Sequence, residues 1–372
     1  MKILSCSDVH LDTFQAFSKP VDNMVSNSRL ENSLKALDMF FAYGKNNSVK
    51  IYVINGDLFN QRLKINPGMY SYSMQRLIRA FHNTPKGSTL YLNVGNHDEQ
   101  SRYINPNSVS IIKSFNTNDY TIKVADSSCA VTFDLGESNI LMIPFTEDIE
   151  KSKSEIKNAL NNLNKPTTVF AHLGVENSVS GRWSHKLGGA YNLSDIGWDN
   201  KYVVSIHLGH YHLGQTLKEE VKGYKKAFYE GNLIPINFND VQEDGLGLSK
   251  GFWISDSNTG ETHFKAVTDV LPTFNIISLK SFKSSLSKLS ELTNNNYVRV
   301  IVSDDKEYEK VKSVVNLSNT EIQIKKEIKE VNELGIDSSF SDEQIIKKYF
   351  NKYYKGNKRL LNKALKIIES LN

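Results

Sequence analysis

The sequence predicts an α/β fold in which helices pack on buried β-sheets. Runs such as IYVI at 51–54 and YVVSI at 202–206 are apolar at nearly every position, as in strands buried on both faces. Between the first two predicted strands, Leu30, Leu34 and Leu37 recur at helical spacing. A strand, a helix and a strand in succession indicate a layered α/β domain.

The first domain is expected at residues 1–272. A strand ending at Asp8 precedes the first helix, for which Gly44 is the expected stop. The second helix places one set of apolar residues on a single face: Met74, Leu77, Ile78 and Phe81. Further strands follow, and the last two form a hairpin with SNTG at 257–260 as its turn.

After Pro272 the pattern changes to that of a small second α/β domain, residues 273–334. Helix, strand, helix and strand patterns follow one another at 282–292, 297–304, 306–315 and 320–330. Residues 335–372 are expected to hold a linker and a tail of two helices that is broken near Gly356.

Length and composition restrict the class of protein. The chain has 372 residues, 39% hydrophobic and 23% charged, which is ordinary for a globular protein of two or three domains. A net charge of +4 permits a nucleic-acid partner. Cys6 and Cys129 are far apart, Asp8 interrupts the first apolar stretch, and no apolar run is long enough to cross a bilayer. We therefore expect a cytoplasmic protein without a membrane partner, in a bacterial cell or, if phage-encoded, in its host.

Polar side chains follow the predicted strands where they end. They are Asp8, His10, Asp57, Asn96, His97, Asp98, His172, His210 and His212. Ligands gather beyond the carboxyl ends of strands in α/β sheets, and residues two apart on an extended chain point to the same side. The alternative is a set of unrelated polar strand ends. Carboxylate, carboxamide and imidazole groups without thiolate suit Mn²⁺ or a similar ion, so the ordered set favours a metal site.

In order and residue type, this set resembles the calcineurin-like metallophosphoesterases. The resemblance implies a four-layer α-β-β-α sandwich with two bound metal ions, Mn²⁺ being expected and Mg²⁺ the alternative. One ion would be held by Asp8, His10, Asp57 and His212; Asp57 would bridge to the second, held also by Asn96, His172 and His210. His97 would be the catalytic acid that protonates the leaving oxygen, and Asp98 would orient its imidazole.

Other residues near these motifs receive separate interpretations. His207 lies three residues before His210, so on a strand it faces the other way, and we expect a structural role. Arg182, Trp183 and His185 lie on a Gly-rich loop soon after His172. They are predicted to contact DNA, and the alternative is a packed loop.

The sequence on either side of the motifs indicates which type of phosphoesterase the chain resembles. GDLFNQR and GNHDEQ lack the Asp-Arg-Gly segment and the Glu that are usual in protein phosphatases of this family. FYEGN at 228–232, the small domain and the helical tail resemble the Mre11/SbcD nucleases, most of all the shorter phage recombination subunits of the T4 type. Asn60 departs from that pattern, in which Asp or His is frequent.

This resemblance implies Mn²⁺-dependent DNA cleavage by 3′-to-5′ exonuclease and single-strand endonuclease action. It also implies a homodimer, a capping role for 273–334, and a partner that is an SMC-like ATPase of the Rad50/SbcC type. Two alternatives stay open: a DNA-end-binding scaffold without catalysis, and a phosphodiesterase for small nucleotides.

The tail has two amphipathic faces. One face carries Ile345, Ile346, Tyr349, Phe350 and Tyr353, and the other Leu360, Leu361, Ala364, Leu365, Ile368 and Leu371. Residues 341–372 hold eight Lys or Arg and three Asp or Glu, a net of +5. The tail is predicted to dock on the ATPase partner, and the alternative is a helical pair packed on its own domain.

Overall fold

The computed structural model describes most of the chain. The described residues are 1–22, 24–101, 104–126, 129–179, 190–221, 223–242, 246–282, 284–325, 342–354 and 358–369. They divide into two compact units, Met1–Gln323 and Ile324–Asn372. Arg182, Trp183 and His185 and the linker expected at 335–341 lie outside the described residues.

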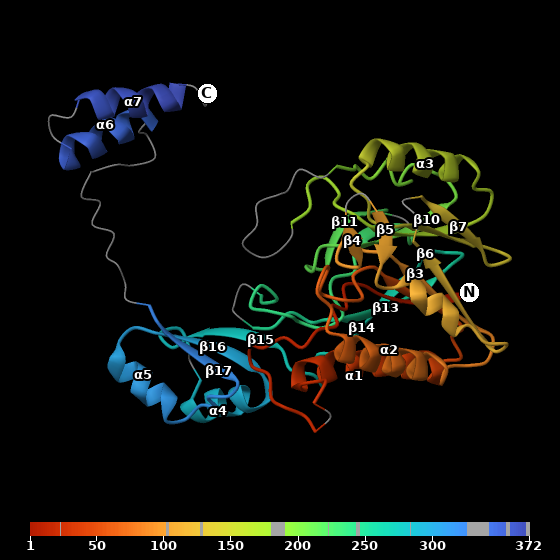
Figure 1. The fold of residues 1–372 in the computed structure, drawn as a ribbon, viewed down its shortest axis with the longest axis horizontal. Coiled ribbons are helices and arrows are strands. Elements are labelled where there is room, and N and C mark those ends of the chain that lie inside the picture. Colours follow the sequence, from red (N-terminus) through yellow and green to blue (C-terminus); the bar gives the residue numbers. More distant parts are fainter. Residues whose placement is uncertain are drawn as a thin grey trace. The chain divides into compact units, whose positions relative to one another are not determined.

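Two six-stranded mixed sheets form the body of the first unit (Figure 1). The first sheet has the order β14 (Thr262–Ala266), β13 (Gly251–Asp256), β1 (Lys2–Cys6), β2 (Ile51–Asn55), β3 (Ser88–Asn93) and β6 (Tyr120–Ala125). The second has the order β11 (Gln215–Glu219), β12 (Lys226–Tyr229), β10 (Val203–Gly209), β9 (Thr167–His172), β8 (Asn139–Ile143) and β7 (Val131–Asp134). Four strands in each are parallel, β1-β2-β3-β6 and β12-β10-β9-β8, and the remaining strands, β13, β14, β11 and β7, pair antiparallel with their neighbours.

The inner faces of the two sheets bury a shared apolar cluster. Its members are Ile3, Ile51, Val53, Tyr91, Ala125, Ile140, Met142 and Phe170. All residues of β2 and β9 are buried, because β2 and β9 have apolar material on both faces. The predicted α/β fold is confirmed, in the form of two mixed sheets and a further small sheet.

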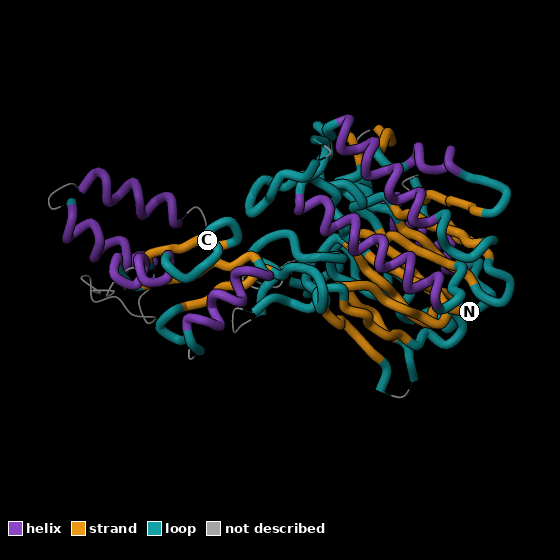
Figure 2. The backbone as a smooth tube through the Cα atoms, turned by 90° about the horizontal axis from the view of Figure 1, so that it is seen from below, coloured by secondary structure: helices purple, strands orange, loops and turns teal. Residues whose placement is uncertain are grey.

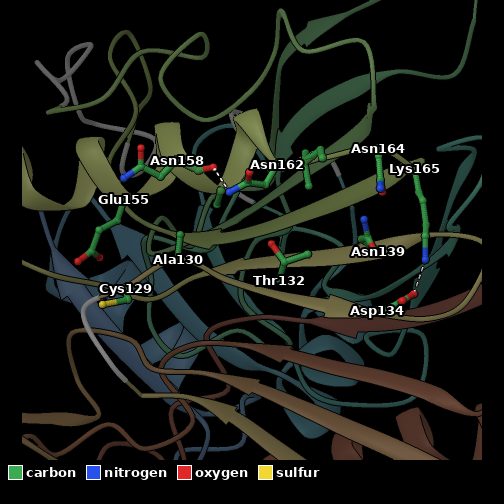
Figure 3. Close-up of a pocket in the computed structure, with 12 residues that line it drawn as sticks. Cys129, Ala130, Thr132, Asp134, Asn139, Glu155, Asn158, Asn162, Asn164 and Lys165 are labelled. Atoms are coloured by element: carbon green, nitrogen blue, oxygen red, sulfur yellow. Dashed lines mark hydrogen bonds and ion pairs between the residues drawn. The ribbon is translucent and has the colours of Figure 1, made fainter.

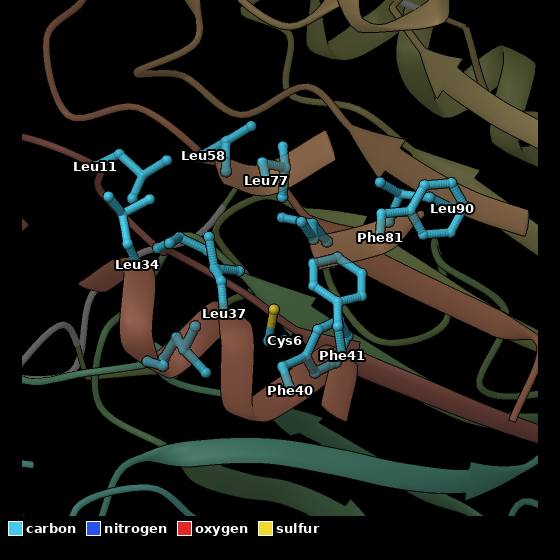
Figure 4. Packing of buried hydrophobic residues seen from close by; sticks show 14 of the residues in the cluster. Cys6, Leu11, Leu34, Leu37, Phe40, Phe41, Leu58, Leu77, Phe81 and Leu90 are labelled. Carbon is cyan, nitrogen blue, oxygen red and sulfur yellow. The ribbon is translucent and has the colours of Figure 1, made fainter. Parts of the chain in front are cut away.

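Helices α1 (Ser28–Asn46) and α2 (Pro67–Phe81) cover the outer face of the first sheet (Figure 2). Asn27 and Asn66 cap their first turns, each side chain accepting two backbone N–H groups. Figure 4 shows Leu37, Phe41 and other side chains of the two helices packed toward Cys6 on β1. Burial of each such Leu or Phe contributes about 1.5–3 kcal/mol.

The expected helix stop at Gly44 is wrong. Helix α1 continues to Asn46, and Gly44 is buried inside it. A Cβ atom at Gly44 would lie 2.2 Å from the hydroxyl oxygen of Tyr52 on β2. The glycine therefore allows close packing of the helix on the sheet, and the helix ends later.

Helix α3 (Ile149–Asn161) covers the outer face of the second sheet, where Ile156 joins its apolar cluster. Two short elements, β4 (Glu99–Ser101) and β5 (Ile104–Asn107), form a hairpin after β3, followed by a 3₁₀ helix at Ser110–Phe115. The hairpin turn predicted at 257–260 is confirmed between β13 and β14.

A small sheet follows the main body. Strand β15 (Phe274–Ser278) pairs in parallel with β16 (Tyr297–Val302), and β17 (Thr320–Ile324) lies on the other edge of β16. Helices α4 (Leu286–Asn295) and α5 (Asp305–Lys312) contribute Leu289 and Val311 to its apolar cluster. The buried guanidinium of Arg29 on α1 lies 5.0 Å from the ring centres of Phe274 and Tyr297, which joins this sheet to the main body. The predicted domain boundaries at 272 and 334 stay predictions.

The second unit contains the two tail helices, α6 (Asp342–Tyr353) and α7 (Lys358–Glu369), as the sequence predicts. Tyr349, Tyr353 and Leu360 are exposed apolar side chains of this pair. None of the helices that the structure describes is long and apolar enough to span a membrane.

Candidate metal centre

Five parallel strands deliver the predicted ligands to one edge of the paired sheets. Asp8 follows β1, Asp57 follows β2 and Asn96 follows β3 in the first sheet. His172 ends β9 and His210 follows β10 in the second sheet. The carboxyl ends of parallel strands meet at one edge, so the fold brings these distant residues together.

The backbone at several of these residues is left-handed. φ is +50° at Asp8, +49° at His10, +50° at Asp57 and +93° at His210. These are four of the eight non-glycine residues with positive φ in the described part of the chain. Such conformations cost free energy and are concentrated at functional sites, where the surrounding structure holds them.

Two glycines create space for the ligands. A Cβ atom at Gly56 would lie 2.1 Å from Nδ1 of His172, and one at Gly95 would lie 2.1 Å from Oδ1 of Asp57. No side chain fits at either position without displacing a ligand. The glycine in each Gly-containing motif is therefore a requirement of close approach across the site.

The first ligand cluster is formed by Asp8, His10, His212 and Asp57. The Nε2 atoms of His10 and His212 lie 2.9 Å apart. Oδ1 of Asp8 lies 3.9 Å from each of these nitrogens, and Oδ2 of Asp57 lies 3.6 Å from Nε2 of His10. Asp8, His10 and Asp57 are at most 1% exposed.

The second cluster shares Asp57 with the first. Oδ2 of Asp57 lies 3.4 Å from Nε2 of His172. Oδ1 of Asn96 lies 3.3 Å from the same nitrogen and 2.8 Å from Nδ1 of His210. The structure thus brings together all seven residues predicted as ligands, with Asp57 between the two groups.

Burial and charge set the protonation of the cluster. Burial lowers the pKa of His10 to about 3 and that of His210 to about 4, so both rings are neutral. Burial acts on His172 in the same direction, but the Asp57 carboxylate outweighs it and raises the pKa of His172 to about 10. The charge of His172 in turn holds the pKa of Asp57 well below its ordinary value, despite the burial of that carboxyl.

These residues fit a pair of divalent ions. Two nitrogens that each lie about 2.1 Å from one ion are about 3 Å apart, which is the spacing of His10 and His212. Carboxylate and imidazole donors form three groups, each within 4.8 Å, that overlap at Asp8, His10 and Asp57. The groups are Asp8, His10 and His212; His10, Asp57 and His97; and Asp8, Asp57 and His172. Oxygen and imidazole donors suit Mn²⁺ and related ions.

His97 lies beside the first cluster. Its ring centre is 4.9 Å from that of His10, and its backbone N–H donates to Oδ1 of Asp57 at 2.8 Å. Nδ1 of the ring lies 2.7 Å from the carbonyl oxygen of Asn60. Because a carbonyl oxygen only accepts, Nδ1 carries the hydrogen and Nε2 is the nitrogen left for chemistry.

Asp98 has different partners from those expected. Its carboxylate accepts the backbone N–H groups of Leu58, Phe59 and Gly95 at 3.0–3.3 Å, while the ring of His97 contacts the Asn60 carbonyl. Burial, with the Asp57 charge, raises the pKa of Asp98 to about 7. Asp98 therefore fixes the loop after β2 and does not orient the imidazole by direct contact.

His207 points away from the ligands, as its spacing suggests. It is fully buried, and its Nδ1 lies 2.8 Å from Oε1 of Glu230. Its Nε2 lies 3.2 Å from the Ser255 hydroxyl. The ring links β10 to the residue that follows β12 and to β13 of the other sheet.

Two buried amide side chains beside the centre, Asn55 and Asn93, were not predicted from the sequence. Nδ2 of Asn55 donates to the carbonyls of Ala171 and His207, and Oδ1 of Asn55 accepts from Nδ2 of Asn93. The Asn55 carbonyl also accepts the Nδ1–H of His172 at 2.8 Å, which leaves Nε2 of His172 for a metal. The available signal was a carboxamide at the end of an otherwise apolar strand.

The FYEGN segment also contributes to the centre. The backbone N–H of Asn232 donates to the His212 carbonyl at 3.3 Å, and Nζ of Lys250 donates to the same oxygen at 2.6 Å. Lys250 is buried and forms an ion pair with Asp240 at 2.8 Å. The position of His212 therefore depends on residues far along the chain.

A separate cavity lies between β7 and α3 (Figure 3). Its volume is about 620 Å³, and Cys129, Asp134 and Glu155 are among its lining residues. None of the candidate ligands lines it.

The fold and the centre together define a metal-dependent phosphoesterase with a candidate dimetal site. The family model for calcineurin-like phosphoesterases matches residues 1–214, and the chain belongs to that family. The predicted family is confirmed at this level.

The solved structures that match the chain share little sequence with it. A dimetal phosphatase from Danio rerio is 11% identical with a TM-score of 0.44, over 69% of this chain and 93% of that one. A hypothetical protein from Thermus thermophilus is 10% identical with a TM-score of 0.37, over 72% of this chain and 97% of that one. No curated protein sequence matches the chain.

Proposed function

We propose that the protein is a Mn²⁺-dependent DNA nuclease of the Mre11/SbcD type, with 3′-to-5′ exonuclease and single-strand endonuclease activity. The observation that carries this proposal is the pair of ligand clusters that share Asp57, with the ring of His97 beside them. A phosphodiester has a negative charge that repels hydroxide and an alkoxide that leaves poorly. The centre supplies groups suited to both difficulties.

Each group in the centre has its own task. When bound, two ions would supply Lewis acidity and lower the pKa of water. Asp57 holds negative charge between the clusters, and Asn55 fixes the ring of His172. His97 is the proton donor for the leaving oxygen, with its Nδ1 occupied by the Asn60 carbonyl. No side chain is required as a covalent nucleophile.

DNA is the proposed substrate because of the parts that follow the ligands. FYEGN, the small domain and the helical tail resemble the Mre11/SbcD nucleases in pattern and order, and not in signature residues. The tail carries a net charge of +5, which suits a polyanion or an acidic protein. Arg182, Trp183 and His185 are proposed DNA contacts.

The tail is also the proposed binding site for an SMC-like ATPase of the Rad50/SbcC type. Helices α6 and α7 expose Tyr349, Tyr353 and Leu360 beside many lysines. An amphipathic pair of this kind fits a groove with an acidic rim. Residues 273–334 are the proposed capping domain, and a homodimer is the proposed assembly.

A nuclease assay with purified protein tests the function. Labelled duplex and single-stranded DNA are incubated with Mn²⁺, with Mg²⁺ and with EDTA, with and without the ATPase. We expect 3′-to-5′ degradation with Mn²⁺ and none with EDTA. DNA binding without cleavage in Mn²⁺ would favour the scaffold alternative. Turnover of a small nucleotide ester that excess DNA does not inhibit would favour the small-nucleotide phosphodiesterase.

A further inference from the structure

A carboxylate outside the two ligand clusters ties together the loops that follow β1 and β2. Oδ2 of Asp12 accepts from Nδ2 of Asn60 and from Nε2 of Gln61, both at 2.7 Å. Oδ1 of Asp12 accepts the backbone N–H of Thr13 at 2.8 Å. Asp12 is only 9% exposed, whereas Asn60 is half-buried and Gln61 is exposed.

The backbones of the two loops are aligned so that Asp12 faces these amides. The N–H of Leu11 donates to the Leu58 carbonyl at 2.9 Å, and the N–H of Asn60 donates to the Leu11 carbonyl at 3.3 Å. Asn60 then presents its own carbonyl to Nδ1 of His97 at 2.7 Å. Asn60 therefore connects the two residues. Its side chain bonds to Asp12, and its backbone carbonyl contacts the ring of His97.

We propose that Asp12 is a positioning residue for His97, acting through Asn60. The proposal rests on the nuclease function above and identifies what orients its proton donor. Asp98 holds the first half of the loop through the N–H groups of Leu58 and Phe59, and Asp12 holds the second half through Asn60 and Gln61. Without Asp12, the Asn60 carbonyl shifts, and Nε2 of His97 turns away from the leaving oxygen.

Exchanging the side chains of Asp12 and Asn60 distinguishes a positioning role of Asp12 from a general role in stability. N60D places a carboxylate against the Asp12 carboxylate, and D12N removes one acceptor. In the pair D12N/N60D, the new amide nitrogen donates to the new carboxylate and the amide oxygen still accepts the backbone N–H of Thr13, so only the bond from Gln61 is lost. The matched control is D148N, a carboxylate-to-amide change at the cap of α3.

Activity is measured with Mn²⁺ on two phosphodiesters, one with a p-nitrophenolate leaving group and one with an alkoxide leaving group, such as a dinucleotide. A proton donor matters for the alkoxide and little for the phenolate. We expect N60D and D12N to lower kcat for the alkoxide ester about 10–100-fold, with KM and phenolate turnover within about threefold. The exchanged pair should recover most of the loss, and neither change should matter further in an H97A background.

Nitrogen NMR of the metal-free protein gives a second readout. His97 should be the Nδ1–H tautomer in the wild type and the exchanged pair, and its ring signals should shift in N60D. Equal losses for both leaving groups, no recovery in the exchanged pair, or unchanged ring signals in N60D would overturn the positioning role. If the wild type hydrolyses neither ester, the proposed function fails, while the ring signals still decide whether Asp12 orients His97.

Discussion

The Nε2 atoms of His10 and His212 lie 2.9 Å apart, although the two residues are 202 positions apart in the chain. Burial lowers the pKa of His10 to about 3, so its ring is neutral at physiological pH. Two imidazole nitrogens that face each other at this distance must share a proton, and a divalent cation can take its place. His10 and His212 therefore form a candidate binding position for the first ion, which the following predictions test.

The change Asp57→Ala should lower the affinity of the protein for both metal ions. Oδ2 of Asp57 lies 3.6 Å from Nε2 of His10 and 3.4 Å from Nε2 of His172, so one carboxylate oxygen faces both clusters. Calorimetric titration with Mn²⁺ should show two sites in the wild type and lowered affinity at both in the variant. The matched control is Asp134→Ala, an exposed carboxylate on β7. One ion retained at wild-type affinity would show that Asp57 is not the bridge.

Metal binding should release a proton from His172. Its pKa is about 10 in the metal-free protein, whereas a ligating imidazole must be neutral. Between pH 6.5 and 8.0 the apparent Mn²⁺ affinity should rise about tenfold per pH unit. Titrations in two buffers of different ionisation enthalpy count the protons, and a count near zero would contradict the assignment.

The interaction between His172 and Asp57 should make the stability of the metal-free protein depend on pH. The pKa of His172 is raised from 6.5 to about 10, so its contribution is complete below pH 6.5 and is lost as the pH rises toward 10. The pKa of Asp57 is depressed from 3.8, so its contribution is present above that pH and is lost in acid. Thermal unfolding in EDTA should show a Tm that falls above pH 6.5, and the fall should be smaller in His172→Ala.

His97→Ala should abolish strand cleavage while both ions stay bound. A proton donor acts in the transition state and contributes about 10²–10⁴-fold, whereas the ligands act already in the resting protein. Cleavage is measured on labelled DNA and metal content by elemental analysis. His82→Ala is a suitable control, because His82 is a half-buried histidine that stacks on Tyr120. Loss of metal from the His97 variant would identify His97 as a ligand.

His207→Ala should cost stability and not chemistry. The change leaves the Glu230 carboxylate buried without its imidazole, which costs about 3–5 kcal/mol. The Tm should fall, and a second change, Glu230→Gln, should recover part of the loss. Metal affinity should stay near the wild-type value at a permissive temperature. A loss of metal equal to that of His210→Ala would show that His207 belongs to the centre.

Truncation after Phe340 should remove partner binding and leave the phosphoesterase intact. The tail helices form a compact unit that is separate from Met1–Gln323. The shortened protein should bind Mn²⁺ normally and no longer co-purify with the ATPase. Unchanged affinity for the ATPase would place the docking site elsewhere, and aggregation or a large fall in Tm would show that the tail packs on its own domain.

The position of the candidate ligands at strand ends could be predicted from the sequence because each depends on local signals. The apolar run before Asp57 or His210 predicts a buried strand, and the polar residue after the run marks the end of that strand. The order of these ends along the chain then defines which edge of the sheet they share. Nothing about long-range packing is needed for that step.

The supporting residues could not be predicted because their roles depend on neighbours that are distant in sequence. Gly44 resembles a helix stop until Tyr52 is known to lie against it. Asp98 follows His97 directly, yet the path of the loop after β2 gives its carboxylate to Leu58 and Phe59. Asn55 and Asn93 meet only when neighbouring strands β2 and β3 are in register.

Because the backbone is left-handed at several ligands, the centre is easier to lose by mutation than to form. Asp8, His10 and Asp57 hold a conformation that glycine adopts without strain, at φ near +50°. A mutation to glycine at any of them would relieve up to about 1–3 kcal/mol of backbone strain while destroying the centre. A copy of the gene that is released from selection for catalysis would therefore drift readily toward a sturdier, inactive fold.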